Sequence, residues 1–238
     1  SIVFASPVSG QLVDIVRGEK RRILSVVIEA DEQDVYESKQ KIDLKSAGSA
    51  EVKAALLSSG LWPMIKQRPF DVIADPNNEP KAIYISSFDT APLAPDYDYV
   101  LHGRKDEFQA GIDALKHLTK GAIHLGMNGK VKQDDVFTGV QNVTRTAFSG
   151  KHPAGNVGVQ IHHTNPINKG EYVWVVNAQD VAIIGRYFLT GKFDLTRTIA
   201  LTGSEVKSPK YYRVIPGSQM DVLIKEQTKK DAEERIIS

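Results

Sequence analysis

The sequence contains no cysteine among its 238 residues, and this excludes several kinds of site. Without a thiol, the chain cannot form a disulfide, hold zinc or an iron–sulfur cluster through thiolates, or use a cysteine nucleophile. An excess of one charge is also missing, because 30 Lys and Arg oppose 29 Asp and Glu and leave a net charge of +1. Nucleic-acid surfaces need a strong local excess of basic side chains, so we expect no nucleic-acid partner.

Long apolar runs are absent as well. Runs such as Ala82–Ile85 have the length of a strand, far below the roughly 20 residues that span a bilayer. No signal peptide is visible and the first residue is Ser1, so we interpret the chain as a segment of a longer protein. A hydrophobic content of 41% and a charged content of 25% are typical of a globular protein with a buried core.

The middle of the chain alternates between strand and helix patterns. Apolar, strand-length runs occur at Ala82–Phe88, Ala122–Met127, Val143–Phe148 and Tyr172–Val176. Apolar residues at spacings of three and four predict a helix from Lys105 to Thr119, and a second helix around Val181–Phe188 that ends at Gly191. This alternation predicts βαβ units, a mostly parallel sheet and the α/β fold class.

The flanking regions have a different pattern. Gln11–Val16 and Ile23–Glu29 predict a hairpin, which is marginal alone and must pack against something else. Asp31–Asp43 is typical of a solvated linker, and a helix follows from Ser49, its expected N-cap, to Gly60. Further strands are expected at Thr198–Leu201 and Tyr211–Ile215, and the charged run Gln227–Glu234 is expected to be solvated.

Nucleotide-binding motifs are missing from the sequence. No Gly-x-Gly-x-x-Gly follows a predicted strand. Gly185–Lys192 resembles a phosphate-binding loop but has one residue too many between its glycines, and it ends a helix, whereas phosphates bind where helices begin. We therefore interpret Gly191 as the cap of a helix C-terminus.

The segment Ser149–Pro166 is the main candidate for a shaped binding loop, and it holds three of the six histidines. His162 and His163 are adjacent and point in different directions on a strand or a helix, so we predict no metal site. His152 precedes a proline that restricts the backbone, and Gly155 permits close approach of another segment. The residues alone leave two interpretations open, a binding loop or a purely structural turn.

Sequence blocks along the whole chain carry a family resemblance. They are Pro7–Gly10, Arg17–Arg21, Ser25–Glu29, Ser59–Trp62, Arg68–Phe70, Asp89–Ala94, His152–Gly155, Asn177–Val181 and Phe188–Gly191. In this order they resemble the A subunit of the bacterial Na⁺-translocating NADH:quinone reductase, a family related to the C subunit of Rnf complexes and to the flavin-binding subunit of complex I. The resemblance implies a truncated β hairpin from the end of a barrel-sandwich hybrid domain at residues 1–35. It also implies a Rossmann-like core of complex I flavoprotein type at residues 36–195, and the start of a β-grasp-type domain at residues 196–238.

The resemblance also implies a function. Such a subunit is peripheral, on the cytoplasmic face of the bacterial inner membrane, in a complex that oxidises NADH, reduces ubiquinone or menaquinone and pumps Na⁺. FAD, FMN and an iron–sulfur centre belong to other subunits, a membrane subunit is the expected partner, and this chain is expected to bind no cofactor. The related complex I subunit holds flavin through a glycine-rich loop that this sequence lacks.

Quinone is the expected substrate. The family's link to quinone binding maps most naturally onto Ser149–Pro166, with contacts expected from His152, Gly155, Ile161, His162 and His163. An apolar slot with hydrogen-bond donors for the two carbonyl oxygens would suit a quinone, and the histidines are the candidate donors. The alternative is a structural docking subunit without a ligand site, with quinone bound by membrane subunits. A largely apolar pocket beside His152 would favour the first hypothesis.

Overall fold

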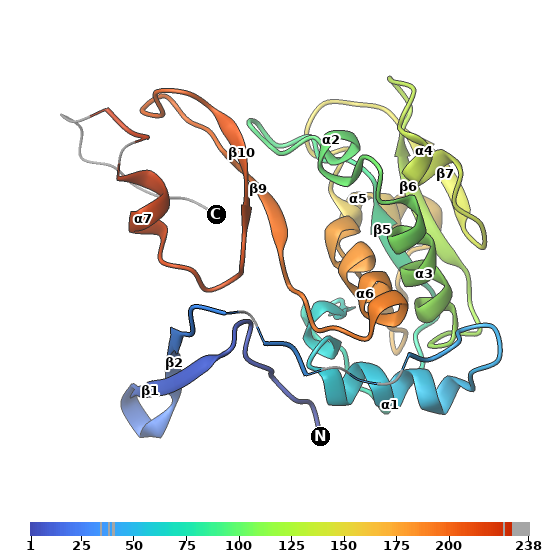
Figure 1. Ribbon diagram of the computed structural model, residues 1–238. Helices are drawn as coiled ribbons and strands as arrows, with labels where there is room; N and C mark the ends of the chain where they lie inside the picture. Colours follow the sequence, from blue (N-terminus) through green and yellow to red (C-terminus); the bar gives the residue numbers. More distant parts are fainter. Residues whose placement is uncertain (34, 38, 40, 226, 230–238) are drawn as a thin grey trace.

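The computed structural model describes residues 1–33, 35–37, 39, 41–225 and 227–229. It has a six-stranded sheet with helices on both faces, and two separate two-stranded hairpins (Figure 1). The predicted linker Asp31–Asp43 is therefore described only in part, and the charged run from residue 230 onward lies outside the described residues. Within the described ranges, no helix is long and apolar enough to cross a membrane.

The elements follow one another in a simple order. The strands are β1 (Gly10–Arg17), β2 (Ile23–Ala30), β3 (Lys66–Arg68), β4 (Val72–Ile73), β5 (Ile83–Ser86), β6 (Ile123–Asn128), β7 (Thr144–Phe148), β8 (Val173–Val175), β9 (Arg197–Leu201) and β10 (Lys210–Val214). The α-helices are α1 (Ser49–Ser59), α2 (Tyr97–Leu101), α3 (Lys105–Lys116), α4 (Asp135–Thr138), α5 (Val157–Thr164), α6 (Ala178–Thr190) and α7 (Met220–Ile224). Short 3₁₀ turns lie at Glu19–Arg21 and Trp62–Met64.

The central sheet is mostly parallel, as the alternating pattern predicted. Its strand order is β4-β3-β8-β5-β6-β7, and β5, β6, β7 and β8 run parallel. The chain moves outward from β5 through β6 to β7 and then returns to place β8 on the other side of β5. The strand order therefore reverses between β5 and β8. In open α/β sheets, such a switch point leaves a crevice at the carboxyl ends of the strands.

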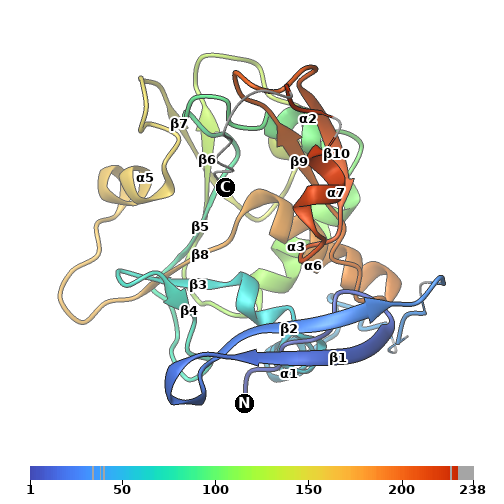
Figure 2. The ribbon, with the colours of Figure 1, turned by 90° about the vertical axis from the view of Figure 1, so that its left-hand side faces the viewer.

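The two faces of the sheet are covered unequally. Helices α3 and α6 lie on one face and α5 lies on the other (Figure 2). The main apolar cluster includes Ile83 and Ile85 of β5 and side chains of α1, α3, α4 and α6. Among the described residues, a second cluster between α5 and the sheet has four buried members, which are Ala82, Tyr84, Ile161 and Val173.

Helices α3 and α6 are in direct backbone contact, and this contact determines where α6 lies relative to the sheet. A Cβ atom on Gly185 would lie 1.7 Å from the Glu107 carbonyl oxygen, and one on Gly111 would lie 2.0 Å from the Val181 oxygen. Only glycine permits this approach. The contact sets the position of α6, and with it the position of the α6 N-terminus next to the ends of β5 and β8.

Several predicted elements are present with small shifts. The helix predicted to begin at Lys105 ends at Lys116 rather than Thr119, and Gly191 caps α6 in a left-handed conformation with a φ of 75°. Helix α1 begins at Ser49, but its N-cap is Gly48, so the expected cap was wrong by one residue.

Other expectations were wrong or incomplete. The segment Ser149–Pro166 is not a loop throughout, because α5 occupies Val157–Thr164 and the Asn156 side chain caps it by accepting from Gly158 N. Gly158 interrupts the apolar pattern, so the helix depends on that cap and on burial of Ile161 against the sheet. The polar strand β3 was also missed, because its pairing with β8 involves a distant part of the sequence.

The hairpins at the two ends are less buried than the core. All but one of the residues in each of β1 and β2 are exposed. Strands β9 and β10 are mostly half-buried, and Tyr211 of β10 packs against the core, with its ring tilted by 32° to that of Tyr99 and the centroids 4.6 Å apart. The tail is therefore docked against the α/β core.

Candidate functional site

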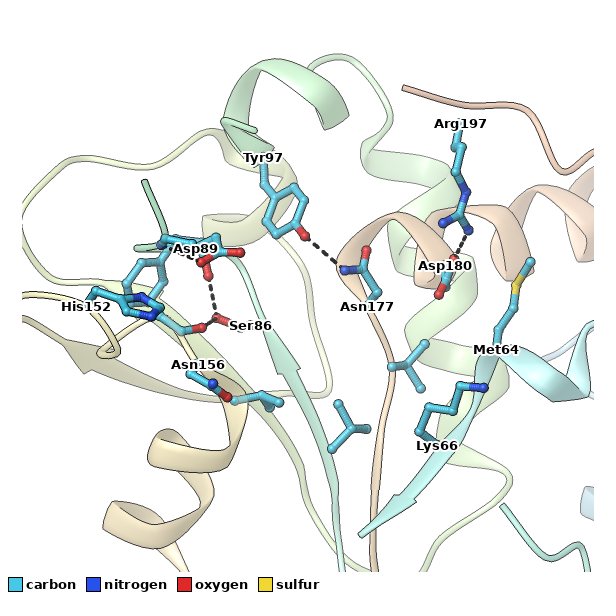
Figure 3. A pocket seen from close by; sticks show the side chains of 16 residues that line it. Met64, Lys66, Ser86, Asp89, Tyr97, His152, Asn156, Asn177, Asp180 and Arg197 are labelled. Atoms are coloured by element: carbon cyan, nitrogen blue, oxygen red, sulfur yellow. Dashed lines mark hydrogen bonds and ion pairs between the residues drawn. The ribbon is translucent and has the colours of Figure 1, made fainter. Parts of the chain in front are cut away.

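A cleft of about 620 Å³ opens at the carboxyl ends of β5 and β8, where the strand order reverses (Figure 3). Its walls come from the loop after β5, the segment before α5, the N-terminus of α6, and residues of β3 and β9. The lining residues that matter below are Lys66, Tyr97, His152, Val175, Asp180 and Arg197. The lining is mixed rather than largely apolar, unlike the slot expected from the sequence.

One end of the cleft, which we call the histidine end, is lined by His152 and Gly155, and Thr90 supports both from behind. Thr90 Oγ1 accepts a hydrogen bond from Gly155 N at 2.9 Å and lies 3.3 Å from His152 Nδ1. Thr90 therefore joins the loop after β5 to the segment before α5. Because this contact uses Nδ1, the Nε2 atom of the exposed His152 ring is left for another partner.

This junction requires glycine at position 155, because the backbone there lies very close to the loop after β5. A Cβ atom there would lie 2.6 Å from Thr90 N and 2.8 Å from Asp89 C, both backbone atoms that cannot rotate away. Ser86 of β5 adds a second tie, because its hydroxyl lies 3.2 Å from the Gly155 carbonyl oxygen. Gln160 of α5 donates to that hydroxyl at 2.9 Å. The histidine end is thus held by backbone packing and by a small hydrogen-bond network.

The opposite end, which we call the basic end, consists of Lys66, Asp180 and Arg197. Asp180 lies in the first turn of α6, its side chain is 14% exposed, and its carboxylate accepts a short hydrogen bond from Arg197. Burial raises the pKa of the Asp180 carboxyl, against the opposing effect of the Arg197 and Lys66 charges. Figure 3 shows the basic end on one side of the cleft and His152 on the other.

Arg197 reaches the cleft because β9 is fastened to the start of α6. Gln179 Nε2 donates to the Thr198 carbonyl at 2.9 Å, and Thr198 N donates back to Gln179 Oε1 at 3.0 Å. This reciprocal pair holds β9 beside α6. The tail of the chain therefore contributes a side chain to a cleft that is otherwise built by the α/β core.

The middle of the cleft is apolar and aromatic. Val175 of β8 pairs with Lys66 of β3 on one side and with Tyr84 of β5 on the other, so it lies between the two ends. Val176 and Val157 also line the cleft. Above them, the Tyr97 hydroxyl accepts a hydrogen bond from Asn177 Nδ2 at 2.9 Å, and burial raises the pKa of Tyr97.

The five predicted contact residues do not all lie in one place. His152 and Gly155 line the cleft. Ile161 is buried against the sheet in the small cluster under α5. His162 and His163 are exposed near the C-terminal end of α5 and do not line the cleft. In the part of the chain that the structure describes, no three His, Asp or Glu side chains form a group able to hold a metal ion.

Sequence reasoning missed the basic end entirely. Lys66 lies on the strand that was not predicted, and Arg197 precedes the predicted strand at Thr198. A local signal existed for Asp180, because Asn177 lies two residues after the end of β8 and caps α6 by accepting from Gln179 N at 2.9 Å. An N-cap after a buried strand marks the edge of the sheet where ligands bind.

The fold and the cleft together define a class of protein: an open, mostly parallel α/β protein with a mixed polar and apolar ligand cleft at its switch point. Three family models match the chain along its length. "NqrA N-terminal barrel-sandwich hybrid domain" matches residues 1–31, "NqrA second alpha/beta domain" matches 47–193, and "NQRA C-terminal domain" matches 198–238. The chain belongs to the NqrA family, the A subunits of Na⁺-translocating NADH-quinone reductases.

Curated relatives agree with this assignment. The chain is 34% identical over 241 residues to the A subunit of the Na(+)-translocating NADH-quinone reductase of Pasteurella multocida, and 37% identical over 240 residues to that of Alcanivorax borkumensis. It is 38% identical over 242 residues to the corresponding protein of Glaesserella parasuis. All of this chain and 53% of each relative are covered, so the chain spans about half the length of the curated relatives it matches.

A solved structure shares the fold at low identity. The NAD⁺-reducing [NiFe]-hydrogenase in its air-oxidized state superposes with a TM-score of 0.51 and 12% identity. The likeness covers 76% of this chain and 39% of that one. At this identity it supports the α/β architecture alone.

Proposed function

We propose that this chain binds the headgroup of a quinone in the switch-point cleft, as part of a Na⁺-pumping NADH:quinone oxidoreductase. The observation that carries the proposal is the cleft beside His152, with polar groups at two ends and valines between them. A quinone ring is flat and apolar with a carbonyl oxygen at each end, so it needs this distribution of groups. The names of the relatives supply the substrate class, since each belongs to a quinone reductase.

At the histidine end, His152 donates to one quinone carbonyl in this proposal. When the Thr90 hydroxyl donates to Nδ1, the proton of the neutral ring resides on Nε2, which is then a donor. Tyr97 and Phe88 supply aromatic surface for the ring, although the segment Ser149–Pro166 itself has no aromatic residue. Ile161 acts indirectly by packing α5 on the sheet, and we assign no quinone contact to His162 or His163.

The proposed setting is a multisubunit complex. The chain belongs to a peripheral subunit on the cytoplasmic face of the bacterial inner membrane, and a membrane subunit is its partner. NADH, FAD, FMN and an iron–sulfur centre belong to other subunits. Within the chain we propose three parts, a barrel-sandwich remnant at 1–35, a Rossmann-like domain at 36–195 and the start of a β-grasp-type domain at 196–238. Hydrogen bonds that join Gln179 and Asp180 of α6 to β9 connect the second part to the third, which supports a site shared by these two parts.

A photoreactive quinone analogue tests this proposal in the intact complex. The label is expected on peptides from residues 86–97 and 150–160, which line the cleft, and an excess of unlabelled quinone should remove it. Label on other subunits alone would contradict a quinone site in this chain.

The second candidate, a docking subunit without its own ligand, also has an observation in its favour. The β1–β2 hairpin exposes large apolar side chains, including Leu12 at 54%, Val13 at 58% and Leu24 at 62%. Apolar surface of this kind is typical of a region that packs against another part of an assembly. Under this hypothesis, substitutions in the hairpin impair assembly, and substitutions in the cleft leave quinone binding unchanged.

A further inference from the structure

We propose that the basic end of the cleft binds the second carbonyl of the quinone, with the Lys66 ammonium as its hydrogen-bond donor. The inference rests on the proposed function, but it assigns a residue that the predicted contact set did not contain. It makes the two ends of the cleft complementary to the two carbonyl oxygens of a 1,4-quinone.

Lys66 is placed as a donor by the sheet. It is the first residue of β3, pairs with Val175 at the end of β8, and is half-buried in the wall of the cleft. Its ammonium has no hydrogen-bond or ion-pair partner among the residues that the structure describes. A half-buried cation without such a partner loses hydration unless a ligand replaces the water.

Asp180 and Arg197 lie beside that donor in the wall of the cleft. The Asp180 carboxylate bonds to Arg197 and not to Lys66, whose positive charge acts on it only at longer range and opposes the rise of the Asp180 pKa. Arg197 also has a buried Nε atom without a hydrogen-bond partner in the described part of the chain. The basic end thus offers unused donors, while its one carboxylate is already bonded.

The charges of the cleft favour a neutral ligand with carbonyl groups over an anion. Lys66 and Arg197 contribute two positive charges, and Asp180 and Asp89 contribute two negative ones. A phosphate group would need a net positive site to replace its hydration. A ketone oxygen needs only a donor, and the cleft supplies donors at both ends with Val175 between them.

The test compares two ligands in the intact complex: a 1,4-quinone, and a matched dienone in which a dimethyl-substituted carbon replaces one carbonyl, so that the ring cannot tautomerise to a phenol. In the native protein the diketone uses both ends and the monoketone uses one, so the diketone should bind roughly tenfold more tightly, the usual range for a hydrogen bond to a charged donor. In Lys66→Met both ligands keep only the histidine end. The ratio of the two dissociation constants should then fall to about one, a change that a general loss of structure would not produce.

Two matched variants complete the experiment. Lys66→Arg keeps a cationic donor and should retain most of the ratio. Lys132→Met makes the same chemical change at an exposed lysine outside the cleft and should leave the ratio unchanged.

Three outcomes overturn the inference. A tenfold ratio that persists in Lys66→Met shows that Lys66 does not bind a carbonyl. An equal loss of affinity for both ligands, with the ratio intact, shows a structural role instead. Displacement of the diketone by pyrophosphate in the native protein but not in Lys66→Met shows that the basic end is an anion site.

Failure of the proposed function gives a different result. In that case the photoreactive quinone labels no residue of this chain, and neither Lys66→Met nor any other cleft variant changes either dissociation constant. Cleft labelling with an unchanged ratio in Lys66→Met therefore refutes only the further inference.

Discussion

The two faces of the central sheet differ in what they bury and in what they can do. Helices α3 and α6 cover one face and α5 covers the other (Figure 2). The apolar side chains of α3 and α6 belong to a large buried cluster, whereas the cluster between α5 and the sheet has four buried members among the described residues. Polar groups take up much of the remaining contact on the α5 face, including Gln160, Ser86 and Thr90. We expect the face covered by α3 and α6 to supply most of the stability. The α5 face, which buries fewer apolar side chains, leaves room for the cleft.

A matched pair of isoleucines tests the difference in stability between the two faces. Ile85 faces the helical cluster and Ile161 packs under α5, and both are buried. Replacing Ile85 with Ala should lower the free energy of unfolding by about 4 kcal/mol, and replacing Ile161 with Ala by about 2 kcal/mol, because the α5 side can collapse more easily around the cavity. Chemical denaturation of the full-length protein measures both. Equal losses would contradict the proposed division of roles.

Gly155 provides a sharper test on the α5 face. A Cβ atom would overlap the backbone of Asp89 and Thr90, so Gly155→Ala should lower the free energy of unfolding by about 2 kcal/mol and separate the two loops of the histidine end. Quinone affinity should fall with it. Gly158→Ala is the matched control, since its Cβ would meet only Asn156 Oδ1 at 3.5 Å. It should stabilise α5 by about 0.5 kcal/mol. An unaffected Gly155→Ala protein would refute the packing argument.

His124 gives the α5 face a dependence on pH. Its ring stacks on Tyr84 with centroids 4.6 Å apart, its Nδ1 atom is buried without a partner among the described residues, and burial lowers its pKa. The unfolded chain therefore binds a proton more readily than the folded protein, and stability falls as the pH drops below about 6.5. His124→Phe should reduce this acid sensitivity in unfolding experiments between pH 7.5 and 5.5. An unchanged slope would show that His124 does not contribute.

The smallest effect is expected away from the α5 face, at His102. Its Nδ1 lies 2.7 Å from Asp134 Oδ2, and this hydrogen bond raises the His102 pKa. The pair therefore stabilises the fold below about pH 6.5, and this contribution is lost as the pH rises through the folded-state pKa. NMR titration should place the His102 pKa above that of an unperturbed histidine, and Asp134→Asn should lower it. Because both partners are near solvent, the shift should weaken in high salt.

Local patterns predicted the parts of the fold that local physics determines. The helices α3 and α6 have apolar residues at helical spacing and Gly191 as a cap, and β5, β6 and β8 are short apolar runs. Helix α5 was missed, because Gly158 weakens its pattern and its burial depends on the sheet beneath it. Strand β3 is polar, and only its pairing with β8 makes it a strand.

For the same reason, the sequence predicted the histidine end of the candidate site but not its basic end. His152 and Gly155 are close in sequence, and their neighbours signalled a shaped segment. Lys66, Asp180 and Arg197 meet only because β3, β8 and β5 are adjacent and β9 returns to the start of α6. No local pattern encodes that strand order. His162 and His163 were attractive as donors, but the helix that was missed directs them into solvent.

The most direct measurement is a structure of the intact complex with a 1,4-quinone analogue bound. We predict density for the ring over Val175, with one carbonyl near His152 and the other near Lys66. Density for the analogue only in other subunits, with the cleft between β5 and β8 empty at saturating ligand, would contradict it.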